Sequence, residues 1–145
     1  MNTTKLKIQL YGSYFLRRKA LPVERVNEEI RDILCQMLQL MYTHKGIGLA
    51  ANQVGILKRL IVIDIGRGPL KMINPCILKK KGEVCIEEGC LSLPQTNVKV
   101  KRARNIEVEY LNEKGKVSYL KAVDLLSICI QHEICLLYTS PSPRD

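Results

Sequence analysis

Apolar residues recur at spacings of three and four near the N-terminal end of the chain. They form one stripe, made of Val26, Ile30, Ile33, Leu34, Met37 and Met41. Such a stripe is typical of a helix with one face on a core, so a helix is predicted over residues 24–42. Gly46 follows as a stop signal, because glycine readily adopts the backbone conformation that ends a helix.

Shorter apolar runs in the middle of the chain predict strands. Residues 57–65 form a strand with a buried centre, and short strands are expected at 77–78 and 83–86. Residues 106–110 alternate apolar and acidic side chains, which predicts a strand with one wet face. After a polar turn, residues 117–122 are expected to return antiparallel to that strand.

A second helix is predicted to begin near Asp124, which can cap its N-terminus. Apolar residues cover most of its circumference, as in a buried helix: Leu125, Leu126, Ile128, Cys129 and Ile130. Gln131, His132 and Glu133 follow directly. Burying these polar groups is costly unless each has a partner, so this QHE motif marks a place with a specific role.

The predicted order of helix, strands and helix indicates the α+β class. We expect antiparallel strands packed around the buried C-terminal helix that carries the QHE motif, plus the N-terminal amphipathic helix. With 145 residues, 46% of them hydrophobic and 26% charged, the chain is long and apolar enough for one globular domain. The six cysteines include no CxxC pair, which excludes the common zinc-finger and thioredoxin-like motifs.

The composition also bears on location and partners. No apolar run approaches the ~18 residues of a membrane span, and the first residues lack a signal-peptide core, so a cytoplasmic protein without membrane contact is expected. The net charge of +9 favours an anionic partner such as RNA, a ribosome or a membrane surface, but a solvated basic surface explains it equally well. The basic runs at 79–81 and 99–104 are more typical of such a surface, and they would also suit transient electrostatic contact with a ribosome.

Two further segments carry candidate chemistry. Residues 46–53 combine small residues, which let another backbone approach, with the amide of Gln53, although a helix stop followed by a tight turn explains them better when they are taken alone. Residues 87–94 place Cys90 in a short polar stretch, where a thiolate could be a nucleophile or a metal ligand and a structural cysteine is equally expected.

The QHE motif is incomplete as a zinc-hydrolase helix, which reads H-E-x-x-H because residues i and i+4 share a face and can hold one metal ion. The position of the second histidine holds Leu136. A lone histidine on an apolar helix, such as His132, is more often a hydrogen-bonded core residue than a ligand.

Taken together and in this order, the motifs GxGxAAxQ, EGCLS and QHE resemble those of the polypeptide deformylase family. The resemblance covers residues 5–134 and includes Gly12, the GIGLAANQVG stretch, Asn74-Pro75 and the closing helix. It implies a metal hydrolase that removes the formyl group from the N-terminal methionine of nascent polypeptides and releases formate.

The resemblance implies a role for each matching residue of the catalytic centre. Cys90 and His132 match two metal ligands, and Glu133 matches the catalytic acid/base. Gln53 and the backbone N–H of Leu91 match the groups that hold the developing oxyanion. One divalent ion, expected to be Fe²⁺ with Zn²⁺ or Ni²⁺ as alternatives, would make hydroxide available from bound water.

Further matches concern the substrate, an N-formyl-methionyl nascent peptide. Ile47, Gly48 and Gly89 match the backbone that pairs with the peptide as an added strand. Ile128 and Cys129 match the wall of the pocket for the methionine side chain. No sequence-specific nucleic-acid contact is expected, and the protein is expected to be a monomer.

The chain departs from the family pattern after Ile134. The family continues with aspartate and the second histidine, where this chain has Cys135 and Leu136. Two ligands make a poor catalytic site, so weak metal binding and little or no activity are expected. Substitution of the missing ligand by the Cys135 thiolate is disfavoured, because it changes both the geometry and the charge of the site.

The last eleven residues, CLLYTSPSPRD, resemble the translation of an adapter used to prepare sequencing libraries. We therefore predict a deformylase-like domain at residues 1–134, incomplete at its C-terminus, and a non-native tail at 135–145. The alternative is a natural, catalytically dead relative that binds a ribosome or nascent chains. An unrelated basic RNA-binding domain is a third interpretation, but the chain carries no known RNA-binding motif.

Overall fold

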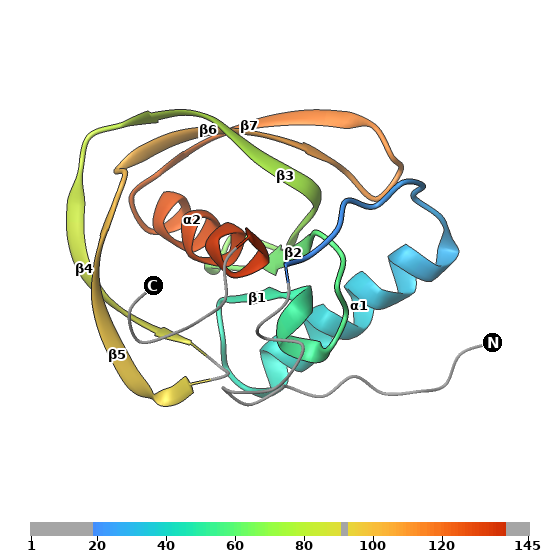
Figure 1. The fold of residues 1–145 in the computed structure, drawn as a ribbon, viewed down its shortest axis with the longest axis horizontal. Helices are drawn as coiled ribbons and strands as arrows, with labels where there is room; N and C mark the ends of the chain where they lie inside the picture. The colour runs from blue at the N-terminus through green and yellow to red at the C-terminus, as the bar shows by residue number, and fades with distance from the viewer. Residues whose placement is uncertain (1–18, 91–92, 139–145) are drawn as a thin grey trace.

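The structure is a computed structural model that describes residues 19–90 and 93–138, with backbone alone for 87–90 and 93–99. Figure 1 shows helix α2 (Asp124–Tyr138) inside a curved frame of strands, while helix α1 (Glu28–Thr43) lies on the far side of β1 (Gly48–Ala50) and β2 (Leu60–Ile63). This arrangement confirms the α+β class with antiparallel strands around the C-terminal helix.

Two sheets make up the frame. The larger has the strand order β1-β2-β3-β6-β7, antiparallel throughout, with β3 at Leu70–Lys81, β6 at Asn105–Leu111 and β7 at Val117–Val123. The smaller is a ribbon of β4 (Val84–Cys90) and β5 (Leu93–Arg102), and a short 3₁₀ helix, η2 (Ala51–Val54), follows β1.

Strand β2 lies between the two helices and contributes side chains to the hydrophobic core on each side. Leu60 and Val62 belong to the apolar cluster that contains the buried face of α1, whereas Ile61 and Ile63 belong to the cluster around α2. Alternate residues of a strand point to opposite faces, so a fully apolar strand is required at this position. The predicted buried centre of 57–65 is thereby confirmed.

Helix α1 begins later than the predicted residue 24. The Oδ1 of Asn27 accepts a hydrogen bond from Ile30 N at 3.1 Å, which caps the helix and fixes its start at Glu28. The predicted apolar stripe is buried from Ile30 onward. At the other end, Lys45 rather than Gly46 takes the left-handed conformation, with a φ of 58°.

Helix α2 is buried over most of its surface, but Leu125, at its first turn, is 48% exposed, contrary to the prediction, and the helix extends through Tyr138. Leu137 is fully buried, and its carbonyl accepts a hydrogen bond from Ala20 N at 2.9 Å. The hydroxyl of Tyr138 donates to Pro75 O at 3.2 Å, and its ring lies 4.5 Å from the Arg59 guanidinium. The helix therefore crosses the predicted boundary at 134 without a break, and that boundary stays a prediction.

The buried side-chain amide of Gln131 has hydrogen-bond partners at both its oxygen and its nitrogen. Its Oε1 accepts from Ala103 N at 2.9 Å, and its Nε2 donates to Ala103 O at 2.8 Å and to the hydroxyl of Ser127 at 2.9 Å. These hydrogen bonds hold Ala103, which lies between β5 and β6, against α2. In the described part of the chain, no helix has the length and apolar character needed to cross a bilayer.

Candidate active site

The centre of the candidate site is the contact between β1 and α2. Glu133 is only 5% exposed, and its Oε2 lies 2.7 Å from the place where a β carbon on residue 48 would be. Only a glycine leaves room for the carboxylate at that position. The structure thus brings together Gly48 and Glu133, two predicted site residues that are 85 positions apart in the sequence.

Strand β1 is the end strand of the larger sheet among the described residues. It pairs with β2 through Gly48–Ile63, Leu49–Val62 and Ala50–Ile61. Ile47 precedes the strand, and its carbonyl accepts from Asp64 N at 2.9 Å. An end strand of this kind can receive an extended peptide along its outer edge.

Gln53 lies in η2, directly after β1, and is 1% exposed. Its Oε1 accepts a hydrogen bond from Ala50 N at 2.9 Å, so the carbonyl end of the amide is fixed and the nitrogen is the donor end. Asn52 Nδ2 donates to the carbonyl of Leu136 at 2.5 Å. This bond ties η2 to α2, the helix that carries Glu133.

The other predicted residues of α2 lie in different environments. Cys129 is buried within the apolar cluster around α2, and Ile128 and His132 are half-buried. Their roles at a methionine pocket and a metal ion stay predictions. Gly89 lies near the end of β4, opposite Asn97 of β5, and the register shifts between Gly89 and Cys90.

The Cys90 side chain and the whole of Leu91 lie outside the described residues, so the predicted sharing of an ion by Cys90 and His132 stays a prediction. Among the residues whose side chains are described, no three of His, Cys, Asp or Glu lie together in a metal-binding group. Leu136 is one turn after His132 on the same helix face and is 7% exposed. An apolar side chain therefore holds the place of the expected third ligand, and the side chains that the structure describes do not complete a three-ligand metal centre.

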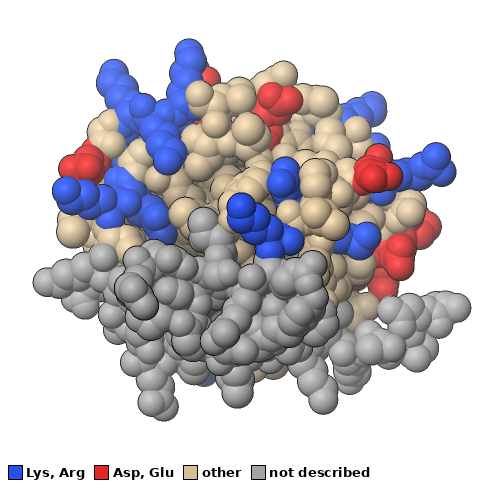
Figure 2. Space-filling view, viewed as in Figure 1, with Lys and Arg blue, Asp and Glu red and all other residues tan. Residues whose placement is uncertain are grey.

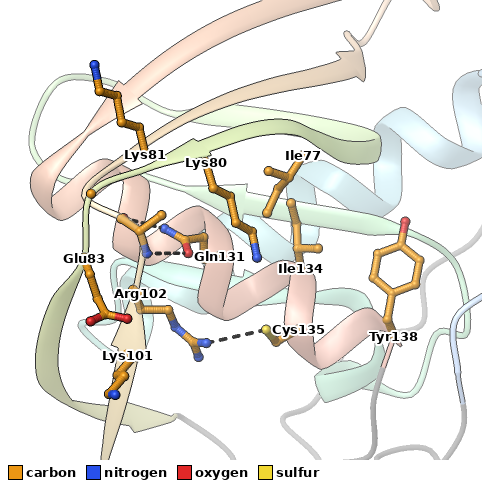
Figure 3. A pocket seen from close by; sticks show the side chains of 12 residues that line it. Ile77, Lys80, Lys81, Glu83, Lys101, Arg102, Gln131, Ile134, Cys135 and Tyr138 are labelled. Atoms are coloured by element: carbon orange, nitrogen blue, oxygen red, sulfur yellow. Dashed lines mark hydrogen bonds between the residues drawn. The ribbon is translucent and has the colours of Figure 1, made fainter.

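Cys135 contacts a different part of the molecule. Its Sγ lies 3.6 Å from Nη1 of Arg102, a contact that sequence reasoning missed. This pair lines a pocket of about 440 Å³. Figure 3 shows that Lys80 also reaches into it. The pocket is formed by the end of β3, the β4–β5 ribbon and α2.

A hydrogen-bonded pair near Ile47 was also missed by the sequence reasoning. The hydroxyl of Tyr42 donates a hydrogen bond to Oδ2 of Asp64 at a distance of 2.5 Å. This bond, together with one from Gly66 N, lowers the pKa of the Asp64 carboxyl. The same carboxylate raises the pKa of Tyr42. The two residues connect the end of α1 to the turn after β2.

Fold and site together define an α+β protein with a buried carboxylate against an end strand. A family model described as polypeptide deformylase matches residues 5–137. The chain therefore belongs to the polypeptide deformylase family, as the resemblance of its motifs implied.

Individual relatives agree with this assignment. The peptide deformylase of Desulfitobacterium hafniense is 48% identical over 123 residues, which are 85% of this chain and 82% of the relative. The crystal structure of the peptide deformylase of Thermotoga maritima has a TM-score of 0.89 and 35% identity, covering 96% of this chain and all of that one. The peptide deformylase of Synechococcus elongatus, solved with actinonin, has a TM-score of 0.88 and 44% identity, with 94% and 76% covered.

Proposed function

We propose that this chain has the framework of a hydrolase that removes the N-formyl group from the N-terminal methionine of nascent polypeptides and releases formate. Membership of the polypeptide deformylase family supports this activity. The observation that carries the proposal is the buried carboxylate of Glu133 against Gly48, because a carboxylate beside an end strand could transfer protons for a peptide bound along that strand.

The substrate would bind as an additional strand. The backbone of Ile47 and Gly48, with that of Gly89, would pair with the formylated peptide. The position of β1 at the end of the larger sheet supports this geometry. Ile128 and Cys129 would form the wall against the methionine side chain, since both belong to the helix that packs on β1.

Three groups would act on the formyl amide. Glu133 would accept a proton from the attacking water and pass it to the leaving amine as the carbon–nitrogen bond breaks. The amide nitrogen of Gln53 and the backbone N–H of Leu91 would donate to the oxyanion that forms on the formyl carbon. The hydrogen bond from Ala50 N, which fixes the carbonyl end of Gln53, supports the assignment of its nitrogen as the donor.

The metal centre is the weak part of this framework. The resemblance implies one divalent ion, Fe²⁺ or alternatively Zn²⁺ or Ni²⁺, with Cys90 and His132 as ligands. Because Leu136 stands where a second imidazole is expected, we propose that this chain binds metal weakly and turns over slowly or not at all. Cys135 is the alternative third ligand, but it faces the pocket that contains Arg102.

The test is formate release from an N-formyl-methionyl peptide by the chain and by a variant with both Cys135→Asp and Leu136→His. We expect little turnover by the chain and clear turnover by the double variant. Adding Glu133→Gln to the double variant should lower turnover by about 10²–10⁴-fold, the usual contribution of a general acid/base. Ordinary turnover by the unaltered chain would overturn the proposal of impairment.

A second candidate is a catalytically inactive module of the same family that binds ribosomes or nascent chains. The buried Leu136 favours it, because the leucine is well packed in the core cluster around α2. The DNA sequence downstream of codon 134 separates the two: Asp-His codons support the enzyme, and genuine Cys-Leu codons support the module. In either case we propose a cytoplasmic monomer with transient ribosome contact.

A further inference from the structure

The solvent side of β3, β6 and β7 presents a cluster of lysines. Lys79 of β3 lies opposite Glu107 of β6, which lies opposite Lys121 of β7. Two residues further along β3, Lys81 lies opposite Asn105 of β6. Residues directly opposite each other in adjacent strands point to the same face, so these lysines share one surface. All three are exposed.

Strand β7 adds two large side chains to the same surface. Tyr119, Lys121 and Val123 alternate along the strand and therefore point the same way. Tyr119 is 69% exposed and Val123 is 52% exposed. We call the surface formed by Lys79, Lys81, Tyr119, Lys121 and Val123 the outer sheet face. A shallow hollow of about 460 Å³ lies on it, between the ends of β3, β6 and β7.

The three lysines of the outer sheet face outnumber the two acidic residues on it. Within the described residues, no carboxylate forms a salt bridge with Lys79, Lys81 or Lys121. Glu107 lies between Lys79 and Lys121 in the register, and Glu109 lies opposite Tyr119. Figure 2 shows Lys and Arg side chains gathered at the upper left, over the corner where β3 passes into β4. Figure 3 shows Lys80 reaching into the pocket beside α2, whereas Lys81 points away from that pocket.

The combination of lysines with an exposed aromatic ring indicates which class of macromolecule the outer sheet face fits. Lys79 and Lys81 are two residues apart on β3, and Lys121 lies two strand spacings away on β7, so the three charges form a triangle around the hollow. A flexible polyanion can contact all three. The tyrosine ring offers a flat apolar surface on which an unpaired base can stack, and acidic peptides lack such a base.

We propose that the outer sheet face binds the phosphodiester backbone of single-stranded RNA without sequence preference, with Tyr119 stacked on a base. The choice of RNA over DNA rests on the proposed function, since nascent polypeptides emerge from an RNA-rich particle. The outer sheet face is separate from the contact of Glu133 with Gly48, so RNA and peptide substrate can be bound independently.

The test is fluorescence anisotropy of a labelled single-stranded oligoribonucleotide, titrated with the full chain over a series of salt concentrations. Replacing Lys79, Lys81 and Lys121 by glutamine should weaken binding and flatten the plot of log K against log salt by about 0.7 for each lost contact. The matched control replaces Arg67, Lys114 and Lys116 by glutamine. These exposed residues lie away from the outer sheet face, and their loss changes the net charge equally. The control should keep the parent salt dependence.

Tyr119→Ala tests the stacking contribution separately. It should weaken binding roughly tenfold and leave the salt dependence unchanged, because stacking releases no counterions. Equal binding by the parent and the lysine variant, or an equal loss in the control, would overturn the proposal. Equal affinity for the matching oligodeoxyribonucleotide would overturn the choice of RNA, and tighter binding of a labelled polyglutamate would assign the face to an acidic protein instead.

The outcome is independent of the deformylase proposal. Formate release by the variant with Cys135→Asp and Leu136→His should be unchanged when the three lysines of the outer sheet face are also replaced. If RNA binding fails while formate release persists, only the inference about this surface is wrong. If formate release fails while lysine-dependent RNA binding persists, the surface stands and the proposed activity is wrong.

Discussion

The side chain of Glu133 fills the space that a β carbon on residue 48 would need, so the position is occupied by Gly48. The Oε2 of Glu133 lies 2.7 Å from the position of a β carbon on residue 48, and its Cγ and Cδ lie 3.1 Å from it. We predict that Gly48→Ala lowers the free energy of unfolding by about 1–3 kcal/mol, the usual cost of overpacking a core. Chemical denaturation measures this change.

A double-mutant cycle isolates the contact. Glu133→Ala removes the carboxylate that the new methyl group would meet, so Gly48→Ala should cost much less in that background. Additive costs of the two substitutions would show that Gly48 and Glu133 do not interact, and would remove the observation on which the candidate site depends.

Gln131 should be needed for the stability of the fold rather than for chemistry. Gln131→Leu leaves the backbone N–H of Ala103 without its side-chain partner, at a cost of about 1–3 kcal/mol, while the carbonyl of Ala103 keeps the hydrogen bond from the Ser127 hydroxyl. The control is Gln39→Leu on the exposed side of α1, which should change stability by less than about 0.5 kcal/mol. Similar costs at both positions, measured by denaturation, would contradict this prediction.

The end of α2 offers a test of the packing beyond residue 134. Leu137 is fully buried, so Leu137→Ala should destabilise the protein by about 2–5 kcal/mol. Leu125→Ala, on the exposed side of the same helix, should cost less than about 0.5 kcal/mol. A negligible effect of Leu137→Ala on thermal unfolding would indicate that residues after 134 do not belong to the folded unit.

The Tyr42–Asp64 pair should make stability depend on pH at both extremes. The lowered pKa of Asp64 means that its contribution is present above the unfolded pKa and is lost as the pH falls through the folded pKa. The raised pKa of Tyr42 means that its contribution is present below the unfolded pKa and is lost as the pH rises through the folded pKa.

Asp64→Ala should therefore lower stability most at intermediate pH, and the difference from the parent should shrink in acid and in alkali. In an absorbance titration of tyrosinate, the same variant should bring the pKa of Tyr42 back toward its ordinary value. An unchanged titration would show that the two side chains do not share a hydrogen bond in solution.

The sequence predicted those elements whose signals are local. The stripe of α1, the apolar circumference of α2 and the alternation in β6 each lie within a few turns or residues, and all three were confirmed except at Leu125, which is exposed. The prediction covered only residues 77–78 of β3, because the strand continues into the lysine run at 79–81, and it missed β5, whose alternation is confined to residues 98–101. Their pairing comes from neighbours distant in the chain, such as Lys80 with Ile106.

The candidate site was predicted through motif order rather than geometry. Gln53, Gly48 and Glu133 were named from their resemblance to a family, and the sequence could not indicate that the last two touch. The contacts of Arg102 with Cys135 and of Tyr42 with Asp64 join residues that are 33 and 22 positions apart and carry no motif. Such pairs are set by the tertiary fold.

We propose that Cys90 and His132 would hold one metal ion and that Leu136 leaves this site incomplete. Co²⁺ titration with absorption spectroscopy tests it directly, because a thiolate bound to cobalt gives a charge-transfer band. The variant with Cys135→Asp and Leu136→His should show this band at a stoichiometry of about one ion per chain. The unaltered chain should show it only weakly. Either Cys90→Ser or His132→Ala should abolish it in the double variant. A strong band in the unaltered chain, or one that survives both single substitutions, would show that the proposed metal site is wrong.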